Sequence, residues 1–393
     1  MARVVIAAGG TAGHVVPAIA VADALRAEDA EVSFLGTRER AEADLVPAAG
    51  YEIDFLRVSG LDRRNPLKAA AAIWRAARTV GAARRLLGVR RADVMLGAGG
   101  YVAGPAGLAA VRMGIPLVLA EADSHLGLAN RMLVRRARRV CLSFPIPGRD
   151  GGPYLLTGRP IPRAVLEADA AIARRRFGIP EPADCVTVVG GSLGARSINL
   201  AAFEAYTRLE RGLPHDHVGQ PWILHVAGRR DYPELRRRWD EEGRPERYQL
   251  IAYEPDLGDV LAAADLVVAR AGGSVMEIAA AGRPAILIPY PHATGDHQRA
   301  NVRWMADGGA AVVIPDSELT PDRLTGAITE LLDAERRLRE MAVAARHLAK
   351  PDAAQRIARE VLEAAERGSM RGGSDDARAR DSGTREMSEE PPV

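Results

Sequence analysis

The feature that most constrains the fold is a strand followed by a glycine loop and a helix, because this unit occurs twice. The sequence VVIAAGGTAGHVVP begins at Val4, and CVTVVGGSLGARSIN begins at Cys185. Glycine permits a tight turn and a close approach of the backbone to a ligand. The helix that follows offers free N–H groups and a positive dipole end to an anion. The repeat therefore predicts two similar domains, each with a ligand-binding loop.

Short β-rich runs alternate with helical patterns such as Pro17–Ala27 and Leu67–Leu87. The expected strands are Arg3–Ala8, Glu31–Leu35, Val94–Leu96, Leu117–Leu119, Arg139–Leu142, Trp222–Val226, Tyr248–Ile251, Leu266–Ala269, Ala285–Ile288 and Ala311–Ile314. This alternation predicts an α/β fold of two Rossmann-like, doubly wound parallel-sheet domains. Ligands bind outside the carboxyl ends of such strands, so we expect a central cleft that both domains face.

The domain boundary is expected at the TGRPIP segment, which interrupts the alternation around Gly158–Pro162. We predict an N-terminal domain over 1–160, a C-terminal domain over 161–340 and a helical segment over 341–367. Residues 368–393 have no large apolar side chains apart from methionines, which predicts a disordered tail.

The composition excludes several functional classes. A formal net charge of +2 gives no global field for nucleic-acid binding. Cys141 and Cys185 lie in no CxxC motif, which argues for a reducing compartment and against a zinc site or disulfide framework. The chain starts directly in a strand, and no apolar run reaches the roughly 18–20 residues of a membrane span. We expect a cytoplasmic protein without a signal peptide.

The glycine loops match neither common nucleotide motif. Neither loop reads GxGxxG, and the second strand is followed by Gly36 and Thr37 rather than by an acidic residue. This weakens a nicotinamide dinucleotide interpretation, and no Walker A sequence is present.

The most informative stretch is ARAGGSVMEIAAAGRPAILIPYP over Ala269–Pro291. Arg270 ends a strand, and Ser274 can cap the helix that follows. Glu277 falls in the first turn of that helix, where it either stabilises the helix dipole or accepts hydrogen bonds from a ribose diol. Downstream, HATGDHQRAN forms either a plain loop or a polar cluster for sugar hydroxyls.

Together these pieces resemble the MurG family of peptidoglycan N-acetylglucosaminyltransferases. The matching segments occur in the family's order from Val4 to Ala364, and they are GGTAGHVVPAIAVADAL, EADLVP, GAGGYVAGPAGLAA, GLANR, GGSLGARSIN, ADLVVARAGGSVMEIAAAGRPAILIPYP and HQRAN. The resemblance implies a GT-B fold. It also implies transfer of GlcNAc from UDP-GlcNAc, with inversion, to the muramoyl 4-hydroxyl of undecaprenyl-pyrophosphoryl-MurNAc-pentapeptide (lipid I), giving lipid II.

The resemblance gives the N-terminal domain to the acceptor and the membrane, and the C-terminal domain to UDP-GlcNAc. It gives Ser192 to the phosphates, Glu277 to the ribose diol and Gln298 to the sugar. The donor loop it implies consists of Gly273, Ser274, Val275 and Met276. Neither glycine loop holds a DxD motif, and helix N-termini with an arginine can stabilise the departing pyrophosphate. We therefore expect no metal and no cofactor.

The sequence departs from the family at several positions. Ala12 stands where the family commonly has Gly, and the donor loop is one residue shorter than in some members. Ala120-Glu121-Ala122-Asp123 replaces a His-Glu-Gln-Asn run, so that Asp123 stands where an asparagine touches the donor sugar. GRPIPR replaces the usual Gly-Asn-Pro-x-Arg, which leaves the expected substrate-binding Arg163 one position further along.

Inverting transfer needs a base for the acceptor proton, and the unperturbed pKa of histidine, about 6.5, suits this task. His14 is therefore interpreted as the base or as a ligand of the acceptor pyrophosphate beside Thr11, Ala12 and Gly13, with a structural role as the third reading. Glu121 and Asp123 are alternative bases. Asn130 and Asn199 are structural or substrate-facing, and the helix-interior spacing of Asn199 favours a structural role.

The segment Arg57–Arg91 is basic, with Asp62 as its only acid. It is interpreted either as a core-facing helix with a solvated basic face or as a peripheral patch for an anionic membrane. In the second interpretation Trp74 and the nearby leucines enter the interface, which would dock the chain at the cytoplasmic face of the membrane. Two other functions stay open: transfer to another lipid or glycan acceptor, and a non-catalytic protein that binds nucleotide sugars.

Overall fold

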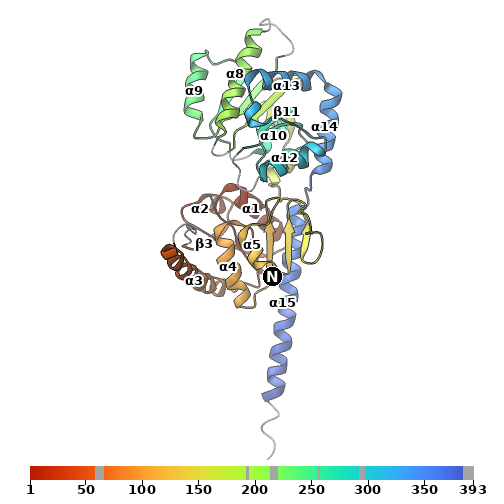
Figure 1. Cartoon of the computed structure of the whole chain (residues 1–393). Coiled ribbons are helices and arrows are strands. Elements are labelled where there is room, and N and C mark those ends of the chain that lie inside the picture. Colours follow the sequence, from red (N-terminus) through yellow and green to blue (C-terminus); the bar gives the residue numbers. More distant parts are fainter. Residues whose placement is uncertain (58–65, 192–193, 213–219, 255–256, 292–296, 384–393) are drawn as a thin grey trace, which may run out of the picture. The chain divides into compact units, whose positions relative to one another are not determined.

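The computed structural model describes the chain except for residues 58–65, 192–193, 213–219, 255–256, 292–296 and 384–393 (Figure 1). The chain forms two compact units. Unit 1 comprises Met1–Pro160 and Asp352–Val393, and unit 2 comprises Ile161–Pro351. No helix of the described residues is long and apolar enough to cross a membrane.

Unit 1 is built on a seven-stranded parallel sheet in the order β3-β2-β1-β4-β5-β6-β7. Its strands are β1 Arg3–Ala7, β2 Glu31–Gly36, β3 Glu52–Phe55, β4 Val94–Gly97, β5 Leu117–Glu121, β6 Arg139–Leu142 and β7 Tyr154–Leu156. The five strands expected in this half are present. The sequence missed β3 and β7, the short strands at the two edges of the sheet.

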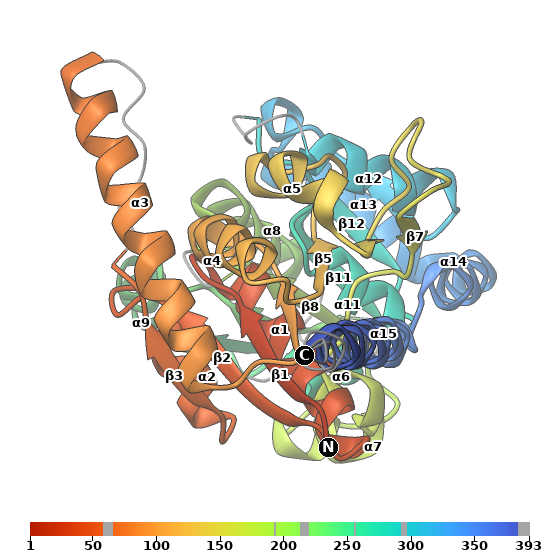
Figure 2. The same ribbon diagram turned by 90° about the horizontal axis from the view of Figure 1, so that it is seen from below.

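Helices cover both faces of this sheet. Successive strand residues point to opposite faces, and in β1 both sets are apolar and buried. Val4 and Ile6 of β1 pack into one core with α1 and α15, and Val5 and Ala7 pack into another with α3 and α4. Figure 2 shows α3 beside α4 and α15 beside α1. The helices are α1 Ala12–Ala27, α2 Glu42–Ala48, α3 Pro66–Val89, α4 Gly100–Arg112, α5 Leu128–Leu133 and α15 Ala353–Gly383, with the short 3-10 helix η1 Val134–Arg136.

The C-terminal end differs from the expected division into a segment over 341–367 and a disordered tail. Helix α14, Glu335–Leu348, belongs to unit 2, whereas α15 returns to unit 1 and buries Ile357 and Val361 there. An ion pair between Arg139 Nε and Glu360 at 2.7 Å also holds α15. The helix continues to Gly383 rather than ending near 367. Once a helix is docked, each further residue adds one hydrogen bond without a new nucleation step. Residues 384–393 lie outside the described residues.

Unit 2 repeats the design with a six-stranded parallel sheet in the order β10-β9-β8-β11-β12-β13. Its strands are β8 Cys185–Val189, β9 Trp222–Val226, β10 Tyr248–Ile251, β11 Leu266–Arg270, β12 Ala285–Ile288 and β13 Ala311–Val313. Its other helices are α6 Arg163–Glu167, α7 Ala170–Arg176, α8 Arg196–Gly212, α9 Tyr232–Glu241, α10 Leu257–Ala262, α11 Val275–Ala280, α12 His297–Asp307, η3 Asp316–Glu318 and α13 Pro321–Asp333.

In both units the first strand lies inside the sheet, and the order reverses between it and the fourth strand of the unit. This is the strand order of a doubly wound nucleotide-binding domain, whose ligand site lies outside the carboxyl ends of the strands at the reversal. The predicted fold class is confirmed. The glycine loops after β1 and β8 stand at these two reversal points.

Candidate active site

The first glycine loop is shaped by close backbone contact with the loop after β4. Gly100 has a φ of +77°, and a Cβ placed there would lie 1.9 Å from the carbonyl oxygen of Gly9. A Cβ at Gly99 would lie 2.7 Å from Nδ1 of His14. The glycines of the GAGGYVAGPAG run therefore let the loop after β4 pack against the first glycine loop and the His14 ring.

A buried carboxylate fixes the other side of this loop. Glu42 of α2 accepts hydrogen bonds from the backbone N–H of Gly10 at 3.0 Å, the backbone N–H of Thr37 at 2.9 Å and the Thr37 hydroxyl at 2.7 Å. A Cβ at Gly36 would lie 2.6 Å from Cγ of Glu42. Glu42 thus ties the first glycine loop to the loop after β2. The sequence analysis quoted EADLVP but gave Glu42 no role.

His14 lies in the first turn of α1, behind the exposed Thr11 and Gly13. Its Nδ1 is buried and has no hydrogen-bond partner among the described residues. Burial lowers the pKa of His14, and the Arg159 cation lowers it further, whereas the Asp123 carboxylate raises it. The imidazole is therefore neutral at pH 7, which is the state in which it can accept a proton.

Glu121 holds its own loop together. It is the last residue of β5 and is 4% exposed. Oε1 accepts from the backbone N–H of Asp123 at 3.1 Å, and Oε2 accepts from the N–H of Gly127 and from Nδ2 of Asn130, both at 2.8 Å. Burial raises its pKa, and these hydrogen bonds oppose that rise. Because both oxygens are engaged within the loop, the geometry suits Glu121 and Asn130 to positioning Asp123 rather than to proton abstraction.

The structure brings an arginine to this site that the sequence analysis did not single out. Arg159 is 4% exposed and donates to the carbonyl oxygen of Gly13 and, at 3.3 Å, to that of Ala122. The expected Arg163 instead begins α6 in unit 2, where its exposed guanidinium pairs with Glu167 at 2.6 Å. The sequence did contain one indication of Arg159. In GRPIPR, Arg159 occupies the position at which the family's Gly-Asn-Pro-x-Arg motif has its asparagine.

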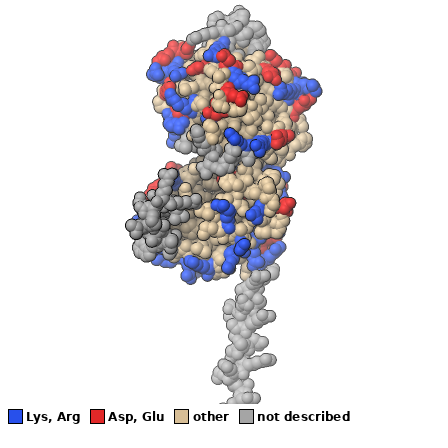
Figure 3. Space-filling view, in the orientation of Figure 1, with Lys and Arg blue, Asp and Glu red and all other residues tan. Residues whose placement is uncertain are grey.

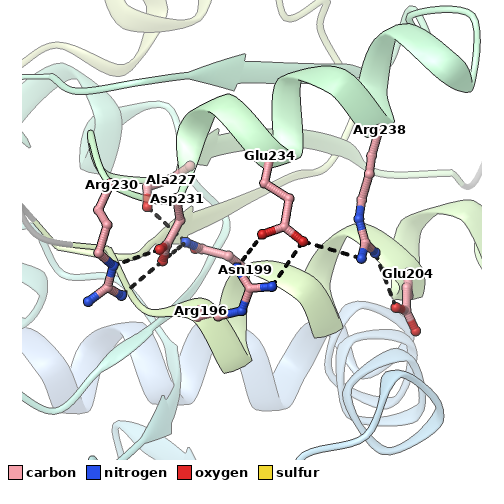
Figure 4. Close-up of polar contacts among 8 residues, drawn as sticks. All are labelled: Arg196, Asn199, Glu204, Ala227, Arg230, Asp231, Glu234 and Arg238. Carbon is pink, nitrogen blue, oxygen red and sulfur yellow. Dashed lines mark hydrogen bonds and ion pairs between the residues drawn. The ribbon is translucent and has the colours of Figure 1, made fainter.

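The second glycine loop rests on a buried polar network of unit 2. Asn199 of α8 donates from Nδ2 to the carbonyl oxygen of Ala227 at 2.8 Å and to Oδ2 of Asp231 at 3.0 Å (Figure 4). Its Oδ1 therefore accepts, at 2.9 Å, from Nε2 of His225, which leaves the histidine Nδ1 to accept from the Tyr248 hydroxyl. Asn199 is fully buried, which agrees with a structural role.

This network explains the glycines of the loop. A Cβ at Gly194, whose φ is +86°, would lie 2.5 Å from Oδ2 of Asp231, and a Cβ at Gly228 would lie 2.4 Å from the Gly194 nitrogen. Figure 4 also shows Arg196, Glu234, Arg238 and Glu204 linking α8 with α9. The loop after β8 is thus held against the loop after β9. Ser192, the expected phosphate ligand, lies outside the described residues.

The loop after β11 is anchored from α12. Asn301, 2% exposed, donates from Nδ2 to the carbonyl oxygens of Ala271 at 3.0 Å and Gly272 at 3.4 Å. Gln298 accepts from the backbone N–H of Tyr290 at 2.8 Å. The HQRAN segment is therefore a helix start that braces two loops, and the side chain of His297 lies outside the described residues.

Glu277 is 9% exposed in the first turn of α11, whose first residues Val275 and Met276 are buried. Ser274 occupies the N-cap position, but in the described structure its side chain makes no capping hydrogen bond. Arg270, at the end of β11, donates from Nη2 to the Ser197 hydroxyl at 2.7 Å and pairs with Asp316. Arg270 and Asn301 thus hold the carboxyl end of β11 and the start of the loop that follows it, in which Gly273 is half-buried.

The basic helix α3 has a core face over its described part. Val80 and Leu87 are buried in the core of unit 1, so this leucine does not enter a membrane interface, whereas Arg84 and Arg85 are exposed. The side chain of Trp74 lies outside the described residues. On the face shown in Figure 3, unit 1 displays several basic side chains and few acidic ones.

No group of three or more His, Cys, Asp or Glu side chains in the described part of the chain has the arrangement of a metal site.

Fold and site together define a glycosyltransferase of family 28. The family's N-terminal domain profile matches residues 4–142, and its C-terminal domain profile matches residues 185–357. The chain is 41% identical over 358 residues to the UDP-N-acetylglucosamine--N-acetylmuramyl-(pentapeptide) pyrophosphoryl-undecaprenol N-acetylglucosamine transferase of Halorhodospira halophila, covering 90% of this chain and 96% of the relative. It is 40% identical to the transferase of the same name from Moorella thermoacetica, covering 93% and 100%.

Among solved structures, MurG of Acinetobacter baumannii matches with a TM-score of 0.71 and 30% identity, covering 92% of this chain and 99% of that protein. The chain therefore belongs to the MurG family. A UDP-GlcNAc 2-epimerase from Neisseria meningitidis bound to UDP-GlcNAc also matches, with a TM-score of 0.62 and 14% identity, which shows the fold alone.

Proposed function

We propose that the chain transfers N-acetylglucosamine from UDP-GlcNAc to the undecaprenyl-pyrophosphoryl-linked MurNAc-pentapeptide, forming lipid II for peptidoglycan. The observation that carries this proposal is the identity of about 40%, over nearly the full length, to transferases of that name. The acceptor 4-hydroxyl loses its proton to a base as its oxygen attacks C1 of the sugar. The bond from C1 to the β-phosphate oxygen breaks, and UDP leaves from the opposite face with inversion.

His14 is the proposed base. Its neutral ring lies at the carboxyl end of β1, at the strand-order reversal of unit 1. Because Nδ1 packs against Gly99, the other ring nitrogen, Nε2, is the one that would accept the proton. Thr11, Ala12 and Gly13 form the rim on which the acceptor pyrophosphate would lie. Asp123, held by Glu121, would accept hydrogen bonds from a sugar hydroxyl.

Unit 2 is the proposed donor domain. The Glu277 carboxylate would accept hydrogen bonds from the ribose diol, and Gln298 would contact the sugar. The donor loop of Gly273, Ser274, Val275 and Met276 would contact the nucleotide. Asn301 would keep this loop in position, because it holds the backbone at Ala271 directly before it. Ser192 and the amides before α8 would receive the charge of the departing pyrophosphate, as helix N-termini do for anions.

Unit 1 is the proposed membrane-facing part, at the cytoplasmic face of the membrane. The exposed Arg84 and Arg85 of α3 would meet anionic headgroups, each contributing about 1 kcal/mol. Val80 and Leu87 are buried in the core of unit 1 and take no part in this contact.

The test is incubation of the purified chain with radiolabelled UDP-GlcNAc and, in parallel, lipid I or diacylglycerol. Label is expected in the lipid I product only. Label in diacylglycerol would instead support the other lipid acceptor, to which the altered run at Asp123 points. Binding of UDP without transfer to either lipid would favour the non-catalytic interpretation.

A further inference from the structure

Arg159 is a buried cation that donates hydrogen bonds to backbone carbonyls at two different loops. It is 4% exposed and lies between β7 and the end of unit 1. One terminal nitrogen donates to Gly13, in the first turn of α1 directly after the first glycine loop, and the other donates to Ala122, in the loop after β5. A planar guanidinium reaches two acceptors in fixed relative positions, which a single ammonium group does not.

These two loops carry the reacting side of unit 1. Gly13 directly precedes His14, and Ala122 directly precedes Asp123. The guanidinium lies directly beside Gly13, since a Cβ placed there would be in ordinary contact with a terminal nitrogen of Arg159 at 3.7 Å. Displacing the guanidinium would therefore free both loops at the residues next to the proposed base and the proposed sugar ligand.

We propose that Arg159 is a positioning residue for glycosyl transfer: it clamps the loop after β1 to the loop after β5 and offsets the charge of Asp123 at the His14 ring. The inference rests on the proposed function, because it assigns Arg159 a part in the same reaction.

The electrostatic half of the proposal follows from the two charges that act on His14. The resemblance to the family places asparagines at the positions of Asp123 and Arg159, whereas this chain has a carboxylate and a guanidinium, and both charges act on the His14 ring. Asp123 raises the pKa of His14, and Arg159 lowers it. With Asp123 alone, the ring would hold its proton to a higher pH. Burial is the largest cause that lowers the pKa of His14, and the cation adds to it, so that both favour the neutral form that accepts a proton.

The first experiment measures the titration of His14 by the NMR shift of its ring C–H signal, assigned by comparison with a His14→Gln variant. Arg159→Gln should move the His14 pKa upward, Asp123→Asn should move it downward, and the double variant should lie between the two. The matched control is Arg283→Gln, because Arg283 is a half-buried arginine of unit 2 that likewise donates to two backbone carbonyl oxygens, those of Ala264 at 2.7 Å and Ala262 at 2.8 Å. The control should leave the His14 pKa unchanged. An unchanged His14 pKa in Arg159→Gln would overturn the electrostatic half.

The second experiment measures turnover and UDP binding in Arg159→Lys, which keeps the charge but not the two-pronged contact. We expect kcat to fall about 10- to 100-fold, as for a displaced catalytic group, while UDP affinity and the His14 pKa stay near those of the parent chain. Wild-type turnover in Arg159→Lys would overturn the proposal that Arg159 holds the two loops together. If Arg159→Gln does not fold, the turnover of Arg159→Lys alone tests the proposal. Titration and UDP binding need no turnover, so failure of the proposed function is distinguishable from failure of this inference.

Discussion

The buried His225 should make unit 2 sensitive to mild acid. Its ring lies between Tyr248 and Asn199 in the interior, and burial lowers its pKa to about 3 from an ordinary 6.5. The folded chain therefore keeps His225 neutral where the unfolded chain would protonate it. Stability is fully present above pH 6.5 and is lost as the pH falls from 6.5 towards 3.

The magnitude follows from proton linkage. Each pH unit below 6.5 removes about 1.4 kcal/mol from the free energy of unfolding for one such group. Between pH 7 and pH 5, His225 alone should remove about 2 kcal/mol. Other groups titrate as well, including His14, whose pKa is also lowered. The quantity to compare is therefore the difference in the free energy of unfolding between the parent chain and His225→Gln, because the contributions of the groups that both proteins share cancel.

The assay is urea unfolding at pH 7 and pH 5, followed by tryptophan fluorescence. Three of the four tryptophans, Trp222, Trp239 and Trp304, belong to unit 2, so the signal reports mainly on that unit. His225→Gln should be less stable than the parent at pH 7, because its buried partners lose a hydrogen bond. The stability gap should narrow by about 2 kcal/mol at pH 5. A gap of equal size at both pH values would refute the reasoning.

Three further predictions concern the proposed site. Glu277→Ala should weaken UDP binding by about 2–3 kcal/mol in calorimetric titration, because a hydrogen-bonded charged acceptor is lost; unchanged affinity would leave Glu277 only its helix-dipole role. His14→Ala should lose most turnover while UDP affinity stays near that of the parent, and parent activity should persist in EDTA. Loss of UDP binding in His14→Ala would show that His14 belongs to the UDP site rather than to the acceptor site. Loss of parent activity in EDTA would show that the reaction needs a metal ion. Sedimentation with anionic vesicles should fall with salt, and it should fall further after substitution by Glu of Arg75, Arg78, Arg84 and Arg85. Activity on a detergent-soluble lipid I analogue should be spared in this variant, and equal sedimentation of variant and parent would return α3 to a purely structural role.

The central strands were predictable because their signal is local. The run Val4–Ala7 is apolar on both faces, as a strand covered by helices on both sides requires. The edge strand β3 carries no such run, and the apolar run of β7 is only three residues long. The sequence EIDF mixes charged and apolar residues, and β7 has three half-buried residues. The return of α15 to unit 1 depends on Ile357 and Val361 finding a core more than 200 residues earlier in the chain, which no local pattern encodes.

The residues of the candidate site likewise fall into those with a local sequence signal and those that depend on distant contacts. His14, Glu277 and Gln298 follow strands and glycines, so sequence order alone places them at strand ends. Glu42 and Arg159 act through backbone groups of distant loops, and no spacing in the sequence reveals such contacts. Glu121 was singled out as a candidate base, but the hydrogen bonds that occupy both its oxygens are visible only in the folded loop.

The most direct test of the account is a single-turnover reaction of the purified chain with radiolabelled UDP-GlcNAc and lipid I, with lipid product and released UDP measured together. The account predicts one labelled GlcNAc in β linkage on the lipid for each UDP released, at a rate that His14→Ala reduces severely. Release of UDP without lipid-borne label, or an undiminished rate in His14→Ala, would contradict it.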